Sequence, residues 1–428
     1  MAWRFPTSVS GSGTQIDLGD GVGDLYVAPQ VFIASTSGIA VYGNGSNHEV
    51  RVYGTVASAS GAILLGNGTT DSGNRILIEN GARVDSISSS AITVRGVEAE
   101  ITNRGVITGH YGAHFDTYGY LHSNLFNAGK IEADNFGVYH TGNETLNVSN
   151  TGLISAENFA FYSENIAIDN LTNTGTINGD VSLGDGEDTF DSRVGSLTGV
   201  ANGGEGDDTL YAGAGNNSLL GGAGYDILAG GAGADRIDGG ADTDTVTYFY
   251  ATTGVTVSLT TPSTNKGDAA GDTFVSIQNI SGSGFNDILT GNSVANKING
   301  NGGNDVIRGY AGNDTLTGAS GKDTFIFHTA LSAMTNVDKI SDFSAVYDTI
   351  QLENGIFTAL TATGALSAAA FRANGTGIAG DVTDRIIYET DTGKLFYDRD
   401  GSGSSYDGVL FATLVSKPTI SSSDFIVI

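Results

Sequence analysis

The sequence contains no cysteine, only four prolines and few basic residues. Without cysteine, the chain can form neither a disulfide scaffold nor a thiolate metal site, and it has no thiol nucleophile. Its 19 Lys and Arg against 47 Asp and Glu give a net charge of −28, which excludes a nucleic-acid-binding protein. No apolar run approaches the roughly 18 residues of a transmembrane helix, so we expect no membrane span.

Glycine, by contrast, is abundant, with 64 residues among 428, about twice the usual share. Collagen is excluded because proline is scarce and glycine shows no three-residue period. The first residues, Met1 to Pro6, lack the charged and apolar segments of a cleavable signal peptide. We therefore expect a chain that either stays inside the cell or is exported by a route without such a peptide.

The first of two internal repeats occupies residues 30–180 and has the form apolar-x-Asn-x-Gly-x-Ile. Asn103, Asn127, Asn150 and Asn173 recur at nearly equal intervals, and Asn80 extends the series backwards. A period of about 23 residues with short apolar runs predicts a solenoid coil of two or three strands, with the asparagines stacked inward at a turn. We predict a right-handed parallel β-helix of about six coils. The pattern resembles the passenger β-helices of autotransporters.

The second repeat is a nonapeptide, Gly-Gly-x-Gly-x-Asp-x-(apolar)-x. Five contiguous copies cover residues 203–247, five more cover 282–326, and an outlying copy lies at 184–190. Glycines at the first, second and fourth places permit a turn that points carbonyl oxygens inward, and the sixth place adds a carboxylate. Ca²⁺ takes 6–8 oxygen ligands, so carbonyls and carboxylates together suit it better than they suit Mg²⁺.

This nonapeptide resembles the repeat of RTX, or hemolysin-type, calcium-binding proteins. In such β-rolls two nonapeptides make one coil and calcium lies between the stacked turns of every second repeat, so the resemblance implies Ca²⁺ as the cofactor. The implied ligands are Asp188, Asp208, Asn217, Asp226, Asp235, Asp244, Asp287, Asn296, Asp305, Asp314 and Asp323, with the turn glycines Gly204, Gly206, Gly222, Gly224, Gly231, Gly233, Gly303 and Gly312.

Departures from the pattern predict weaker or missing sites. Asn217 and Asn296 supply a neutral oxygen, while Asp242 and Phe285 replace the fourth-place glycine of their turns. Stacked carboxylates repel one another without a metal, so we expect the rolls to be largely disordered until Ca²⁺ binds.

The segments outside the two kinds of repeat are expected to be rich in β-strands. We expect a β-helix at 1–180, a first β-roll at 181–247, a spacer at 248–281, a second β-roll at 282–326 and a β-rich cap at 327–428. The predicted fold is therefore all-β. The terminal run from Asp424 to Ile428 resembles the uncleaved C-terminal signal of type I export substrates.

A catalytic role would have to use the N-terminal β-helix, since the chain lacks His-Glu-x-x-His and Gly-x-Ser-x-Gly. Polysaccharide lyases and C5-epimerases place acid and base residues on such helices. His114, Asp116 and His140 are the candidates, with Asp116 and His140 expected as stacked neighbours. The alternative interpretation is an aromatic and polar face that stacks because the coils stack, without the epimerase Asp-Pro-His signature.

These observations lead us to expect a secreted calcium-binding protein that is extracellular or bound to the cell surface. We expect a structural or adhesive role, as an adhesin, surface-layer or matrix component, with the type I export machinery as a partner. Self-assembly and binding to a surface glycan remain open. The alternative function is a secreted polysaccharide lyase or C5-epimerase.

Overall fold

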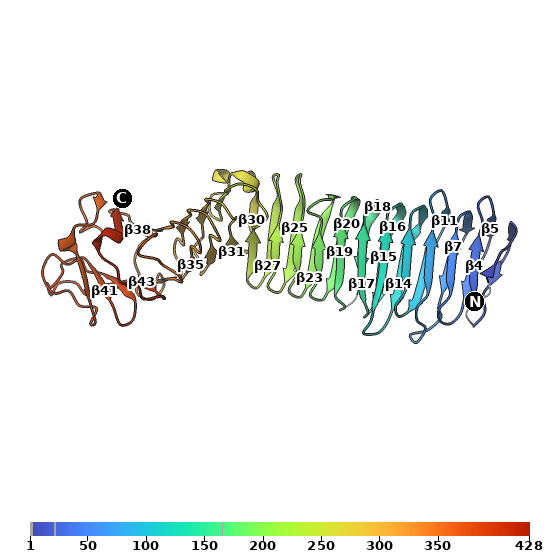
Figure 1. Cartoon of the computed structure of the whole chain (residues 1–428), viewed down its shortest axis with the longest axis horizontal. Helices are drawn as coiled ribbons and strands as arrows, with labels where there is room; N and C mark the ends of the chain where they lie inside the picture. Colours follow the sequence, from blue (N-terminus) through green and yellow to red (C-terminus); the bar gives the residue numbers. More distant parts are fainter. Residues whose placement is uncertain (1–2, 21–22, 165) are drawn as a thin grey trace. The chain divides into compact units, whose positions relative to one another are not determined.

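The computed structural model describes residues 3–20, 23–164 and 166–428, and it divides into two compact units. The first contains Met1–Gly230 and Arg236–Asp242, and the second contains Gly231–Asp235 and Thr243–Ile428. Both consist of β-strands joined by turns, and the second also contains a few short 3₁₀ helices, so the all-β prediction is confirmed (Figure 1). Among the described residues, no helix has the length and hydropathy needed to cross a membrane.

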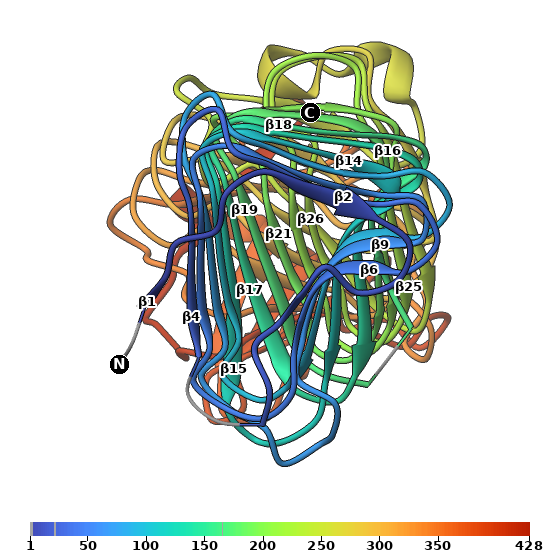
Figure 2. The same ribbon diagram turned by 90° about the vertical axis from the view of Figure 1, so that its right-hand side faces the viewer.

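The first unit is a solenoid of parallel strands stacked in register, as the view along its stack shows (Figure 2). Each coil gives one strand to a first sheet and one long or two shorter strands to a second. The strands of the first sheet are β1 (Trp3–Arg4), β4 (Asp24–Val27), β7 (Glu49–Val52), β10 (Arg75–Ile78), β13 (Glu100–Asn103), β15 (His122–Asn127), β17 (Thr145–Asn150), β19 (Asp169–Asn173), β21 (Thr189–Asp191), β24 (Thr209–Tyr211) and β26 (Ile227–Ala229).

The second sheet of this unit includes three long strands that turn a corner within one coil, β14, β16 and β18. Its strands are β2 (Val9–Gly11), β3 (Ile16–Asp17), β5 (Phe32–Ser35), β6 (Ile39–Gly43), β8 (Thr55–Ser58), β9 (Gly61–Leu65), β11 (Arg83–Ser86), β12 (Ser90–Gly96), β14 (Val106–Thr117), β16 (Lys130–Gly142), β18 (Leu153–Ser163), β20 (Thr176–Asp185), β22 (Ser196–Thr198), β23 (Val200–Glu205), β25 (Ser218–Ala223) and β27 (Arg236–Ala241).

From β4 onward, the coils of the first unit become shorter along the chain without a break in strand pairing. The coils between β4 and β13 are the longest, those of the asparagine repeats are shorter, and those of the nonapeptides are the shortest. The unbroken pairing is seen at one inward residue of each coil, which is buried and whose side chain stacks on that of the next coil. These residues are Leu25, Val50, Ile76, Ile101, Leu125, Val148, Leu171, Phe190, Leu210 and Leu228.

The asparagine column begins one coil later than the sequence predicts. Asn103, Asn127 and Asn150 are buried, and each side-chain Nδ2 donates to the Oδ1 of the asparagine in the next coil at 2.7 Å. Ile78, rather than Asn80, lies opposite Asn103. The placement of Asn80 in the column was wrong because its coil is longer than those of the asparagine repeats, which puts Asn80 in the turn after β10.

Replacing one asparagine of this column is expected to destabilise the β-helix. In Asn127→Leu, the Oδ1 of Asn150 loses its bond from the neighbouring amide, and the Nδ2 of Asn103 loses one acceptor. An unsatisfied buried polar group costs about 1–3 kcal/mol. Thermal unfolding with Ca²⁺ present measures the effect. The control is Asn135→Leu, since that asparagine bonds Asn158 at the surface; equal destabilisation by both variants would contradict the role of the column.

The second unit consists of two rows of short parallel strands and ends in a partly antiparallel cap. One row contains β28 (Asp244–Thr247), β31 (Ile277–Ser281), β33 (Lys297–Asn299), β35 (Thr315–Thr317), β37 (Asp338–Ile340) and β43 (Val409–Leu414), followed by β42 (Lys394–Tyr397), β41 (Ile386–Glu389) and β40 (Phe371–Asn374). The other contains β29 (Thr256–Ser258), β32 (Ile288–Thr290), β34 (Val306–Arg308), β36 (Thr324–Phe327), β38 (Thr349–Leu352), β44 (Phe425–Val427) and β39 (Gly364–Ala365).

The second unit also contains β30 (Thr273–Val275) and the 3₁₀ helices η1 (Pro262–Thr264), η2 (Gly267–Ala269), η3 (Ala368–Ala370) and η4 (Ser422–Asp424). The core between the rows is formed by the eighth residues of the nonapeptides, such as Leu289, Ile307 and Phe325, which are fully buried. The rows bring each nonapeptide turn directly over the turn two repeats earlier.

Candidate metal centre

Buried aspartates form columns at the turns of the nonapeptides. The backbone N–H of Asp188 donates to Oδ1 of Asp208 at 2.8 Å, and that of Asp208 donates to Oδ1 of Asp226 at 2.9 Å. In the second unit the N–H of Asp287 donates in the same way to Asp305, and that of Asp305 to Asp323. A second column there joins Asn296 to Asp314. Each carboxylate thus uses one oxygen to join two coils.

The other oxygen of several of these carboxylates has no protein partner. The Oδ2 atoms of Asp188, Asp208, Asp305 and Asp314 are buried and accept no hydrogen bond from the described residues. A buried charged oxygen without a partner is costly. A cation in the turn would remove that cost.

The turn glycines show where such a cation would fit. A Cβ added to Gly300 would lie 2.1 Å from Oδ2 of Asp305 and 3.0 Å from the carbonyl oxygen of Gly318. A Cβ on Gly203 would lie 2.1 Å from Oδ2 of Asp208 and 2.6 Å from the carbonyl oxygen of Gly221. The first-place glycine therefore leaves open a small space faced by one carboxylate and one carbonyl of the next turn.

Carbonyls must supply most of the ligands in such a site. No three His, Cys, Asp or Glu side chains come together as a metal centre anywhere in the described part of the chain. A hard cation that accepts backbone carbonyls, such as Ca²⁺, fits this donor set, whereas softer metals prefer nitrogen and sulfur ligands.

Burial raises the pKa of the column carboxylates. The pKa is raised to about 9 at Asp188, about 7 at Asp208 and Asp305, and about 6 at Asp314, because burial penalises their charged form. Without metal, the folded turns therefore bind protons more tightly than the unfolded chain does.

In the absence of calcium, protonation of these carboxylates at acidic pH is therefore expected to stabilise the folded turns in part. A raised carboxyl pKa gives a contribution to stability that is complete below the unfolded value near 4 and is lost as the pH rises through the folded values of about 6 to 9. In a chelator, circular dichroism should show more β-structure at pH 5.5 than at pH 8.5, and saturating Ca²⁺ should reduce the difference. More β-structure at the higher pH in chelator would contradict this linkage.

The columns extend beyond the nonapeptides to aspartates that sequence reasoning missed. The N–H of Asp314 donates to Oδ1 of Asp338, and the N–H of Asp323 to Oδ1 of Asp348. Asp169 takes the same position in the first unit, where it accepts from the N–H of Leu146. Each lies two residues before a buried apolar residue, which was the available signal, but their turns lack the glycine pattern.

The three candidate catalytic residues do not form one site. His114 lies on the outer face of β14, where its ring stacks on Tyr139 with centroids 4.6 Å apart, and burial lowers its pKa to about 4. Asp116 pairs with Arg95 and lies opposite Thr141, so the expected stacking of Asp116 on His140 was wrong by one residue.

His140 lies on β16 and points to the opposite face from its neighbour Thr141. Neighbouring residues of a strand point to opposite faces, so His140 enters the core while Thr141 lies beside Asp116. Its Nδ1 lies 3.0 Å from Oδ2 of Asp169, and neither side chain is exposed. The pair satisfies the carboxylate that begins the aspartate column of the first unit.

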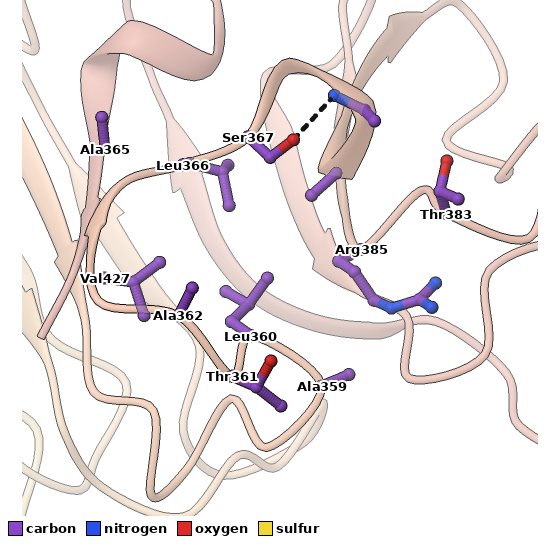
Figure 3. Close-up of a pocket in the computed structure, with 12 residues that line it drawn as sticks. Ala359, Leu360, Thr361, Ala362, Ala365, Leu366, Ser367, Thr383, Arg385 and Val427 are labelled. Carbon is purple, nitrogen blue, oxygen red and sulfur yellow. Dashed lines mark hydrogen bonds between the residues drawn. The ribbon is translucent and has the colours of Figure 1, made fainter.

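The second unit also contains a pocket of about 340 Å³ near the C-terminal strand (Figure 3). Leu360, Leu366 and Val427 form part of its apolar lining. Arg385 lies at its edge, where its guanidinium donates to the carbonyl oxygens of Val382 and Asp384. The lining holds no acid and base pair, so we assign no chemistry to the pocket.

The architecture therefore defines a parallel β-solenoid whose turns are lined with buried aspartates and inward carbonyls. A family model described as the RTX calcium-binding nonapeptide repeat, of four copies, matches residues 198–228, 211–246 and 290–325. The chain thus carries RTX nonapeptide repeats, and Ca²⁺ is their cofactor. No match was found among curated proteins.

Proposed function

We propose that this chain is a calcium-binding structural or adhesive protein that is exported unfolded through a type I system and folds on Ca²⁺ outside the cell. One observation carries the proposal: buried carboxylate oxygens without a protein partner face the carbonyl of the next turn. Such turns are unfavourable without a cation and favourable with one, so binding and folding are coupled.

Asp188, Asp208, Asp305 and Asp314 are the aspartates that we propose as side-chain ligands, with carbonyl oxygens of the turns as further ligands. Their buried Oδ2 atoms support this assignment. At Asp208, Asp305 and Asp314 the space next to the first-place glycine supports it as well. When bound, the ion supplies positive charge to oxygens that otherwise repel one another. The chain contributes a rigid cradle, because each aspartate is already fixed by the N–H of the preceding coil.

Export before folding agrees with the composition and with the position of the C-terminal strand. Net charge of −28 keeps an unfolded chain soluble. The run that resembles a type I export signal forms β44, in which Phe425 and Val427 are buried, so the export machinery would have to read it before the fold closes.

We do not propose the lyase or epimerase activity. His140 is enclosed in the core and His114 lies on the outer face, so they cannot act on one sugar. The aromatic faces beside His114 are covered by one another: Tyr111 stacks on Phe136, and His114 on Tyr139, at angles of 25° and 19°.

Sedimentation and electron microscopy of the purified chain, with millimolar Ca²⁺ and with chelator, test the proposed role. Filaments or sheets that form only with Ca²⁺ would support a surface or matrix component. Folded monomers that neither assemble nor bind cell-surface polymers would contradict the structural and adhesive role while leaving calcium binding intact.

A further inference from the structure

The turns of the columns occur in two conformations that differ at the second residue. In the turns that end at Asp305 and Asp314 the second residues are Asn301 and Tyr310, whose φ angles are 69° and 77°. In both turns the Oδ2 of the aspartate is buried without a partner. We call these open turns. Two further open turns have Gly184 before Asp188 and Gly204 before Asp208, with φ of 102° and 121°.

Other turns of the same length are closed by their own backbone. The N–H of Ser283, the second residue, donates to Oδ2 of Asp287 at 2.6 Å, and the N–H of Asn292 donates to Oδ1 of Asn296 at 2.9 Å. Neither second residue has a positive φ. The turn from Ser344 to Asp348 is closed in the same way, with its N–H 2.8 Å from Oδ2.

The turn at Asn217 is filled by a different donor. Its side-chain Nδ2 donates to the carbonyl oxygens of Gly213, Gly215 and Gly230. The first place of this turn is Ala212, whereas the open turns at Asp208, Asp305 and Asp314 have glycine there. Carbonyls that could face a cation here face an amide N–H₂ instead.

We propose that calcium binds only to the open turns, and that the closed turn is the metal-free form of the same motif. This inference rests on the proposed calcium-coupled folding, and it adds which of the turns bind an ion. Asp287 and Asn296 then hold no ion, since a backbone N–H already donates a hydrogen bond to the oxygen that would meet the ion. Asn217 holds none because its amide occupies the cradle.

Backbone strain in the open turns supports a bound ion. Residues other than glycine are disfavoured in the left-handed region, about five- to thirtyfold for ordinary side chains. Tyr310 adopts it at the second place of the open turn that ends at Asp314, with φ of 77°. Asn301 adopts it at a lower cost, because asparagine tolerates this region better than other side chains do. The closed turns show that a relaxed alternative exists, so something must favour the open form. An ion between carboxylate and carbonyls does so.

Counting bound ions tests which turns take calcium. Asp305 and Asp287 are neighbours in one column, and aspartate-to-asparagine changes keep the shape of both side chains. Native mass spectrometry of the full chain in Ca²⁺ should show fewer ions in Asp305→Asn and an unchanged number in Asp287→Asn. Loss of an ion from both variants, or from neither, would overturn the inference. A wild-type chain that binds no calcium would instead contradict the proposed function.

Relief of the strain gives a second, independent test. Tyr310→Gly removes the Cβ at a positive φ, whereas Tyr310→Ala removes the same ring and keeps the Cβ. The Ca²⁺ concentration at the folding midpoint should be about fivefold lower for Tyr310→Gly than for Tyr310→Ala. Equal midpoints for the two variants would overturn the role of the second residue.

Discussion

Removal of calcium is expected to unfold the nonapeptide repeats and to leave the N-terminal β-helix folded. The two parts satisfy their turns in different ways. At the corner where the repeats have aspartate, earlier coils of the β-helix have neutral side chains: the N–H of His48 donates to Asn74, and that of Ala99 to Ser123. Asp169, which begins the carboxylate column, has a side-chain partner in His140, whose Nδ1 lies 3.0 Å from its Oδ2.

The open turns of the repeats have no such partner among the described residues. Asp188 and Asp208 keep a buried oxygen without a hydrogen bond, and the core behind the turns is narrow, with one inward apolar residue per nonapeptide. Metal binding free energy is then folding free energy for this segment. The boundary should lie near residue 186, where coils shorten and the column becomes acidic.

Hydrogen exchange in chelator measures this directly. Backbone amides of residues 24–163 should stay protected, while those of 186–326 should exchange rapidly and regain protection with Ca²⁺. Mg²⁺ serves as the control and should restore less, because it prefers a tighter octahedron and retains water. Equal protection of both segments in chelator would contradict calcium-coupled folding.

Gly300→Ala is expected to weaken calcium binding strongly although the change is only one methyl group. The added Cβ would lie 2.1 Å from Oδ2 of Asp305 and 3.0 Å from the carbonyl oxygen of Gly318, which is the space that we assign to the ion. Overfilling a packed site costs about 1–3 kcal/mol. That cost corresponds to binding weaker by about five- to a hundredfold.

Gly302→Ala is the matched control in the same turn. Its Cβ would come no closer than 3.4 Å to a neighbouring atom, the Oγ of Ser320. Calorimetric titration with Ca²⁺ should show the large loss for Gly300→Ala only. Similar weakening by both variants would mean that the turn tolerates no added side chain, and it would contradict the position that we assign to the ion.

The calcium repeats could be predicted from the sequence because each turn depends on residues that are close together in the chain. A turn that needs glycine at fixed places and a carboxylate at the sixth place leaves a nine-residue period, and the inward apolar residues follow it. The columns that join Asp287 to Asp305 and Asp305 to Asp323 follow from that period. The period also places Leu289 and Ile307 in the core.

Other features could not be predicted from the sequence, because they depend on contacts between neighbouring coils. The register of Asn80 was wrong because coil length changes gradually, and a fixed period cannot follow a coil that is longer than its successors. Asp338 and Asp348 join the columns through turns without the glycine pattern. The open and closed forms are also hidden, since Asn301 and Asn292 are the same residue type at the same place with opposite φ signs.

The most direct test of the account is an anomalous difference map from crystals grown in Ca²⁺. We predict peaks about 2.3–2.6 Å from Oδ2 of Asp208, Asp305 and Asp314. Asp169, whose Oδ2 is bonded by His140, should show none. A well-ordered map without peaks beside Asp208, Asp305 and Asp314 would contradict the account.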